Sequence, residues 1–207
     1  MQIKEINEGR IKDIKFFAKG HRGILYRGTY KNREIVIKAK LPQSKAVGRI
    51  RNEIKWLKIL NKYGIGPKLF LSGEDYFVYE FIDGPFILDF FDKANRDEIM
   101  MVIKDVLSQC YTLDKLSINK EEMHHPVKHI IIDRNNNNRA VLVDFERCYK
   151  TKKPHNVTQF CEFLIRIRNV LIEKGISINK EEIINLAKDY KKKISKANLR
   201  KILALLK

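Results

Sequence analysis

A change of hydrophobic pattern near residue 84 constrains the fold of this chain more than any other feature. The first part holds short apolar runs with strand-like character, separated by glycines and by polar pairs such as Lys31-Asn32. Beyond Asp83-Gly84-Pro85, apolar residues recur mainly at helical spacing. Strands followed by helices are typical of an α+β protein. We therefore expect two lobes, a β-rich lobe over residues 1–82 and a helical lobe over residues 83–207.

Periodicity and turn residues predict the individual elements of each lobe. Expected strands cover residues 12–17, 24–30, 34–39, 68–71 and 76–81, and residues 129–132 and 140–143 form a hairpin with an Asn-rich tip. Expected helices cover residues 45–63, 96–113, 157–174, 180–193 and 197–207.

A hexapeptide, Ser-Ile-Asn-Lys-Glu-Glu, begins at Ser117 and again at Ser177. In the second copy, Asn179 and Glu182 have the spacing of a helix N-cap and its capping-box carboxylate. The first copy permits the same interpretation, in which Glu122 is the capping carboxylate.

The chain is strongly basic, with 42 Lys and Arg against 25 Asp and Glu among 207 residues and a formal net charge of +17. Residues 1–51 hold 14 cations and four acids, and residues 190–207 hold seven cations and no acid. Such basicity favours a polyanionic partner, such as nucleic acid, a nucleotide or an acidic protein surface. The competing explanation is that the Lys-rich composition reflects an AT-rich genome or a hot habitat.

Three features predict the cellular location. No apolar run approaches the roughly 18–20 residues of a membrane span, and the first residues lack the apolar core of a secretory signal. The three cysteines are an odd number without a C-x-x-C pair, which indicates reduced thiols. We expect a soluble cytoplasmic protein with no membrane contact.

Two charged residues in apolar surroundings predict an ion pair. Glu53 shares the apolar stripe of Ile50 and Leu57 on an expected helix, and Lys38 ends the apolar run that begins at Ile35. Leaving a buried charge unpaired costs about 3–5 kcal/mol. We therefore expect Lys38 and Glu53 to pair and to join a strand to a helix.

Two further features point to phosphate and cation chemistry. Gly20 and Gly23 lie three residues apart between expected strands, where backbone amides can approach a phosphate, although the same pair also fits an ordinary turn. Asp144 closes an apolar strand and precedes Phe145. A carboxylate in such surroundings is costly unless it binds a cation, so Asp144 is a candidate metal ligand.

In their order along the chain, these features resemble the protein-kinase-like superfamily. Gly20 and Gly23 match the second and third glycines of the Gly-rich loop, and Ala18 stands in the place of the first. Ile35-Val36-Ile37-Lys38 matches V-A-I-K, and Glu53 matches the helix-C glutamate. Residues 76–84 look like the strand and hinge that hold adenine, and Asp144-Phe145-Glu146 looks like D-F-G with Glu in place of Gly. The resemblance runs from about residue 12 to residue 163.

The resemblance implies a two-lobed kinase-like fold, with a β-rich N-lobe and a reduced helical C-lobe, that binds ATP and Mg²⁺. Lys38 would hold the α- and β-phosphates, Glu53 would orient Lys38, and Asp144 would carry Mg²⁺. Glu80, Phe81 and Ile82 would hold the adenine.

The chain is small for this superfamily, because the span from Cys148 to Val157 leaves no room for a long activation segment. In this respect it is similar to the compact atypical kinases, such as the Rio kinases and the kinase of the KEOPS complex. It looks most similar to the archaeal predicted serine/threonine kinases that carry D-F-E-R.

The catalytic loop departs from the family pattern H-R-D-x-x-x-x-N. Aligned from the preceding helix, Glu122 replaces the Asp; aligned back from the following strand, His124 replaces the Asp and His129 the metal-binding Asn. A glutamate or a neutral histidine can act as a base toward a hydroxyl. His129 would be a poor Mg²⁺ ligand, because magnesium prefers oxygen. Together with His125, these histidines also permit a zinc site.

These features predict an ATP-binding atypical serine/threonine protein kinase that transfers phosphate from Mg-ATP to a protein acceptor. One alternative is a pseudokinase or ATPase-like assembly factor whose basic surface docks RNA or a ribonucleoprotein. The other is a small-molecule kinase, because D-F-E also resembles choline-kinase-like and aminoglycoside-phosphotransferase-like sequences. Against it, the chain is short for the helical insertion that builds their acceptor pocket.

Overall fold

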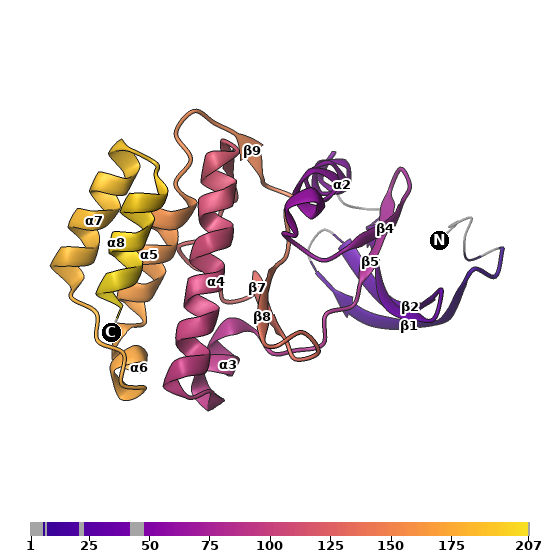
Figure 1. Cartoon of the computed structure of the whole chain (residues 1–207). Helices are drawn as coiled ribbons and strands as arrows, with labels where there is room; N and C mark the ends of the chain where they lie inside the picture. Colours follow the sequence, from indigo (N-terminus) through magenta and orange to yellow (C-terminus); the bar gives the residue numbers. More distant parts are fainter. Residues whose placement is uncertain (1–5, 7, 21–22, 42–47, 207) are drawn as a thin grey trace. The chain divides into compact units, whose positions relative to one another are not determined.

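The computed structural model describes residues 6, 8–20, 23–41 and 48–206 and has an α+β architecture (Figure 1). The chain divides into two compact units. Unit 1 comprises residues 1–82 together with the tetrapeptide Asp144–Arg147, and unit 2 comprises residues 83–143 and 148–207. Within the described ranges, no helix has both the length and the apolar character that crossing a membrane requires.

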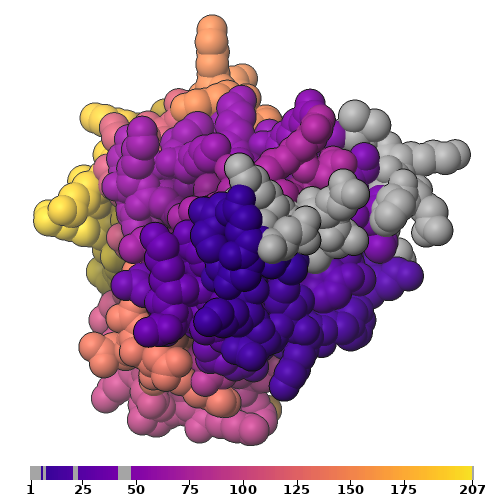
Figure 2. Space-filling model, turned by 90° about the vertical axis from the view of Figure 1, so that its right-hand side faces the viewer, coloured from indigo at the N-terminus to yellow at the C-terminus, as the bar shows by residue number. Residues whose placement is uncertain are grey.

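Unit 1 is built on a five-stranded antiparallel sheet. Its strands are β1 (Ile11–Lys19), β2 (Gly23–Tyr30), β3 (Arg33–Lys40), β4 (Leu69–Ser72) and β5 (Tyr76–Glu80). Their order in the sheet is β1-β2-β3-β5-β4, so β3 is the central strand and β1 an edge strand. The indigo atoms of β1 and β2 lie at the surface in Figure 2.

The register of the sheet separates two faces. Ile37 of β3 lies opposite Tyr26 and Val78, and Lys38 lies opposite Leu25 and Phe77. Directly opposed residues share a face and successive residues alternate, so Ile37 and Lys38 point to opposite faces. The Ile37 face holds a buried apolar cluster whose members are Ile11, Tyr30, Ile35, Ile37 and Val78.

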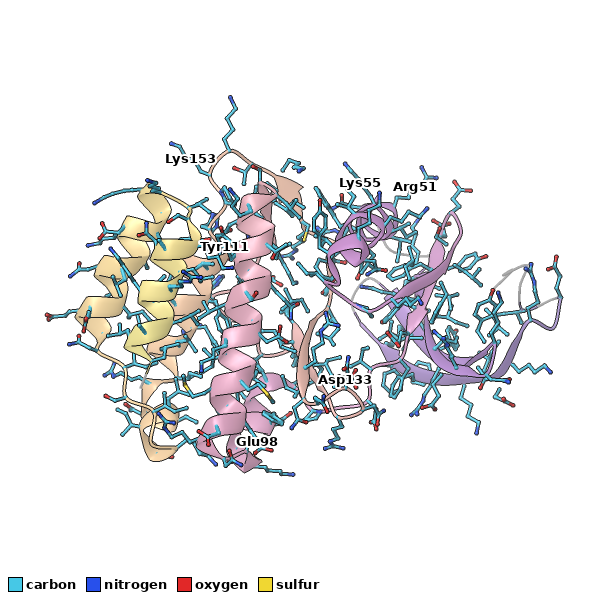
Figure 3. All side chains as sticks on the ribbon, in the orientation of Figure 1. Arg51, Lys55, Glu98, Tyr111, Asp133 and Lys153 are labelled. Carbon is cyan, nitrogen blue, oxygen red and sulfur yellow. The ribbon has the colours of Figure 1, made fainter. Side chains whose placement is uncertain are left out.

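The helix α2 (Arg49–Leu60) packs on the other face, where it meets β4 and β5 (Figure 1). Its buried stripe includes Trp56, Leu57 and Leu60, and a short 3₁₀ turn, η1 (Asn61–Tyr63), extends it. The exposed side of α2 carries Arg51 and Lys55, which point away from the sheet in Figure 3. The helix was expected to begin at residue 45, but residues 42–47 lie outside the described ranges.

Unit 2 is mainly helical. Its helices are α3 (Ile87–Lys93), α4 (Arg96–Lys115), α5 (Asn156–Arg166), α6 (Arg168–Glu173), α7 (Lys180–Lys192) and α8 (Lys196–Leu205), and its short strands are β6 (Ile118–Asn119), β7 (Ile130–Asp133), β8 (Arg139–Leu142) and β9 (Tyr149–Lys150). The long helix α4 packs against α5 and α8 and against the β7–β8 hairpin (Figure 1).

Helix termini show where the sequence prediction holds and where it fails. Asn179 accepts hydrogen bonds from the N–H groups of Glu181 and Glu182 and caps α7, as expected. The first hexapeptide copy begins no helix, because Asn119 lies in β6 and pairs with Tyr149 of β9. The helix expected over residues 157–174 is two helices, because the backbone at Ile167 turns to ψ 13°. The helix α3 and the β6–β9 ladder were not predicted.

Candidate functional site

Lys38 lies between two carboxylates. Its Nζ is 2.6 Å from Oε2 of Glu53 on α2 and 3.5 Å from Oδ1 of Asp144. Lys38 belongs to the central strand β3, Glu53 to helix α2, and Asp144 to the tetrapeptide Asp144–Arg147, and all three are part of unit 1. The strand–helix pair expected from the sequence is therefore present, and the strand-end carboxylate joins it.

Burial decides the electrostatics of this cluster. The Glu53 side chain is 5% exposed and that of Lys38 is 17% exposed. Burial by itself lowers the pKa of Lys38, but attraction by Glu53, Asp144 and Tyr79 outweighs it and holds that pKa above its usual value. Lys38 is therefore a fixed ammonium, which suits it to bind an anionic group.

Asp144 is held in an uncommon backbone conformation. Its φ is 63°, in the left-handed region that residues with side chains rarely occupy. The next residue, Phe145, is fully buried, and a Cβ at Gly66 would lie 2.9 Å from its ring. Gly66, at φ 80°, thus leaves the room in which the ring packs beside Leu57.

Glu146, in the place of the D-F-G glycine, binds α2. Its Oε1 lies 3.0 Å from Nη1 of Arg49, and its backbone oxygen accepts a hydrogen bond of 2.8 Å from Nδ2 of Asn52. The sequence prediction missed Arg49 and Asn52. Neither residue interrupts an apolar pattern, and Glu146 is 97 positions from Arg49, so periodicity carries no signal for this contact.

The two glycines of the expected phosphate loop lie where β1 ends and β2 begins: Gly20 follows β1 and Gly23 is the first residue of β2. The N–H of Gly20 donates to the oxygen of Gly23 at 2.9 Å. A Cβ at Gly23 would lie 3.2 Å from the oxygen of Ala39 and 3.7 Å from Cε of Lys38. Gly23 therefore lies beside Lys38, while residues 21–22 between the glycines are outside the described ranges.

The expected adenine-binding residues follow β5. The N–H of Glu80 donates to Lys68 and that of Phe81 to Glu34, so both are engaged within unit 1, and Ile82 is largely buried. A cluster that the sequence prediction missed surrounds Phe81. The Arg27 guanidinium lies 3.8 Å from the centre of its ring, and Phe17 of β1 meets the ring edge-to-face at 5.9 Å.

In unit 2, Glu122 and His129 are in contact. Oε2 of Glu122 lies 2.9 Å from Nε2 of His129. Residues 121–124 form turns, and Glu122 has φ 72°, so the interpretation of Glu122 as a helix-capping carboxylate is wrong. His124 is not in this contact, and Nδ1 of His125 lies 3.0 Å from Nη1 of Arg166.

Buried hydrogen bonds hold the segment that leads to Glu122. Oδ1 of Asn156 accepts from the N–H of Lys120 at 2.8 Å, and its Nδ2 donates to the oxygen of Ile118 at 2.7 Å. Asp114 of α4 in turn accepts from both nitrogens of Asn156, at 2.9 and 2.7 Å, and from the Tyr190 hydroxyl at 3.0 Å. Because Asp114 and Asn156 are almost fully buried, these bonds are shielded from water.

The donor chemistry suits a hard cation at Asp144 better than at His129. The Asp144 side chain is 37% exposed and offers carboxylate oxygen, which Mg²⁺ prefers, usually with waters and phosphate oxygens as its other ligands. Nε2 of His129 faces Glu122. In the part of the chain that the structure describes, no three His, Cys, Asp or Glu side chains gather into a metal site, and the three histidines considered for zinc do not form one.

Comparison with known proteins identifies a relative of this chain. No protein-family model matches the chain. Over 118 residues, the chain is 30% identical to the uncharacterized protein MJ1211 of Methanocaldococcus jannaschii, and the match covers 55% of this chain and 98% of the relative. Because the identity extends over nearly the whole of that protein, the chain belongs to the same family as MJ1211 of Methanocaldococcus jannaschii.

Proposed function

We propose that this protein has the kinase-like fold and is an atypical serine/threonine protein kinase that binds ATP and Mg²⁺. One observation carries the proposal. A lysine of the central strand, Lys38, lies within 3.5 Å of carboxylates from a helix and from a strand end far along the chain. A buried ammonium held by a helix carboxylate, beside a second carboxylate that can carry a cation, is the arrangement that phosphoryl transfer from ATP uses.

Each residue has a distinct role in this proposal. Lys38 binds the α- and β-phosphates, Glu53 keeps Lys38 extended toward them, and Asp144 holds Mg²⁺. Gly20 and Gly23 let the backbone between β1 and β2 approach the phosphates. Glu122 accepts the proton of the Ser or Thr hydroxyl that attacks the γ-phosphate. Phosphoryl transfer depends mainly on positioning and charge stabilisation, so a shortened catalytic loop is compatible with activity.

Calorimetric titration with Mg-ATP tests the nucleotide site. We expect Lys38→Ala and Asp144→Asn each to weaken binding about tenfold, which is about 1.4 kcal/mol. The matched control is Lys40→Ala, because Lys40 belongs to the same strand but lies near Asp75 instead. Unchanged affinity in both site variants would exclude the kinase-like site. Incubation with labelled ATP and cell extract then asks whether serine or threonine becomes labelled.

An RNA- or ribonucleoprotein-docking pseudokinase is the second candidate, and a surface of unit 2 favours it. Leu199, Ile202 and Leu206 of the C-terminal segment are buried. Exposed cations gather on the C-terminal half of α7, on α8 and on their connection, where Asp189 is the acid among them and pairs with Lys192 at 3.2 Å. We call these cations the α7–α8 cationic surface: Lys188, Lys191, Lys192, Lys193, Lys196, Arg200 and Lys201. Such a surface can bind phosphates whether or not the protein transfers them.

A further inference from the structure

The contact between Glu146 and α2 has a bearing on Asp144. Arg49 and Asn52 are three positions apart on α2, so they lie on the same side of the helix. One binds the Glu146 carboxylate at 3.0 Å and the other its backbone oxygen at 2.8 Å. The Glu146 side chain is 13% exposed and the Arg49 side chain 33%, so the carboxylate of the pair is largely shielded from water. We call Arg49, Asn52 and Glu146 the α2 latch.

Asp144 needs external contacts to keep its conformation. A non-glycine residue at positive φ is disfavoured by about 1–2 kcal/mol and persists only where its surroundings fix it. Phe145 is fixed by burial beside Leu57. The latch fixes the residue after it, so the chain is held immediately beyond the strained position. A glycine in the place of Glu146 would have more conformational freedom and no side chain with which to bind Arg49.

We propose that Arg49, Asn52 and Glu146 are positioning residues that hold the Asp144 carboxylate in the orientation required for Mg²⁺. The inference rests on the proposed function, because it takes Asp144 as the ligand. The latch acts on the metal site through Asp144, because Glu146 lies two positions beyond it on the same segment. We therefore expect the latch to contribute to the part of ATP affinity that depends on the metal and to leave the affinity for metal-free ATP unchanged.

Calorimetry with ATP in Mg²⁺ and in EDTA separates these contributions. We expect Glu146→Gly and Arg49→Gln to weaken Mg-ATP binding about tenfold, the scale on which indirect metal-site contacts act, and to leave ATP binding in EDTA unchanged. The charge-reversed double variant Arg49→Glu/Glu146→Arg should recover part of the loss. The control is Arg51→Gln, because Arg51 lies on the same helix but pairs with the exposed Glu74. If the ratio of the affinity for Mg-ATP to the affinity for ATP in EDTA is the same in the latch variants as in the wild type, the inference is overturned.

Hydrogen exchange of the nucleotide-free protein gives a second measurement that needs neither metal nor activity. In Glu146→Gly we expect hydrogen exchange to be faster at residues 144–148 alone. In the control Arg51→Gln we expect exchange at these residues to match that of the wild type. If the wild type binds no ATP, the proposed function fails, and exchange alone decides whether the latch holds this segment. Equal exchange, or acceleration throughout unit 1 with a lower melting temperature, would instead make the latch an ordinary structural contact and overturn the inference.

Discussion

Oε2 of Glu122 lies 2.9 Å from Nε2 of His129, and this contact joins two residues that the sequence places in competing alignments. One alignment favours Glu122 as the catalytic carboxylate, and the other places His129 at the metal-binding position. Glu122 and His129 are seven positions apart, two more than Asp and Asn in the family pattern. The contact makes the two residues partners, with the imidazole able to orient the carboxylate.

Glu122→Gln tests whether Glu122 is the base. Glutamine keeps the size of the side chain but cannot accept a proton from the attacking hydroxyl. We expect phosphoryl transfer to fall about 100-fold or more, while Mg-ATP affinity and the melting temperature stay close to those of the wild type. Turnover and melting temperature are measured on the same preparation. A variant with wild-type turnover would show that Glu122 is not the base.

The two copies of the hexapeptide show what local sequence can and cannot predict. Both contain Asn-Lys-Glu-Glu, yet Asn179 caps α7 whereas Asn119 lies in a strand. Each copy is followed by one apolar residue, Met123 or Ile183. After Ile183 the helical apolar pattern continues with Ile184, whereas His124-His125-Pro126 follows Met123 and continues no helix. The partners of Asn119 lie about thirty or more positions away, at Tyr149 and His155, and no local pattern predicts them.

Glu53→Gln should destabilise the protein strongly. The substitution leaves the buried Lys38 ammonium with Asp144, at 3.5 Å, as its remaining carboxylate contact in the cluster. Breaking one side of a buried pair costs about 3–5 kcal/mol, and we expect a loss near the lower end, about 3 kcal/mol, in urea unfolding. The double variant Lys38→Met/Glu53→Leu should lose less, because no buried charge remains. If Glu53→Gln costs no more than the control Glu74→Gln on the exposed surface, the pair is not important for stability.

The same pair predicts a specific dependence of stability on pH. Although burial opposes them, Glu53 and Asp144 hold the pKa of Lys38 above its ordinary value of 10.5. A cation whose pKa is higher in the folded state stabilises the fold fully below the unfolded pKa, and this stabilisation is lost as pH rises through the folded pKa. Burial raises the pKa of Glu53 as well, so the window begins where Glu53 is fully ionised. From that pH up to about pH 10, the difference in unfolding free energy between wild type and Lys38→Met/Glu53→Leu should thus stay constant. A decline of this free-energy difference within that pH window would show that the pKa of Lys38 is not raised in the folded protein.

Sequence patterns predict the Lys38–Glu53 pair but not the contacts that complete the site. A charge on an apolar stripe is conspicuous, so Lys38 and Glu53 stand out from the residue pattern alone. Arg49 and Asn52 occupy ordinary polar positions, and their partner Glu146 comes from a distant segment. Asp114 lies in the last turn of α4 and is buried, although an acid in this position usually faces solvent. Only the packing of α4 against α5 reveals that it is buried.

Tyr190→Phe and Asn156→Ala should separate the contributions to the buried network around Asp114. The Tyr190 hydroxyl donates one of the hydrogen bonds that Asp114 accepts. Loss of this hydroxyl should therefore lower the unfolding free energy by about 0.5–1.5 kcal/mol. Asn156 bonds Asp114, Ile118 and Lys120, so its loss should cost more and should accelerate hydrogen exchange of residues 118–123. Equal costs for the two variants would show that Asn156 does not anchor that segment.

Binding of RNA should depend on the α7–α8 cationic surface. If its lysines neutralise about five phosphates, log K should fall against log salt with a slope of about −3.5 for single strands. Removal of residues 190–207 is a poor test, because Tyr190, Leu199 and Ile202 are buried and their loss would disrupt unit 2. Point substitutions of exposed lysines leave this packing intact.

The informative comparison is between two sets of four Lys→Gln substitutions, which change the net charge of the protein equally. The test set is Lys188, Lys191, Lys192 and Lys196, and the control set is the exposed Lys93, Lys104, Lys152 and Lys153. Filter binding to structured RNA at about 50 mM salt should weaken far more in the test set, and the salt slope should become shallower. General attraction by the net charge of +17 would instead weaken both sets alike. Equal retention of RNA by both sets would therefore remove the α7–α8 cationic surface as a binding site.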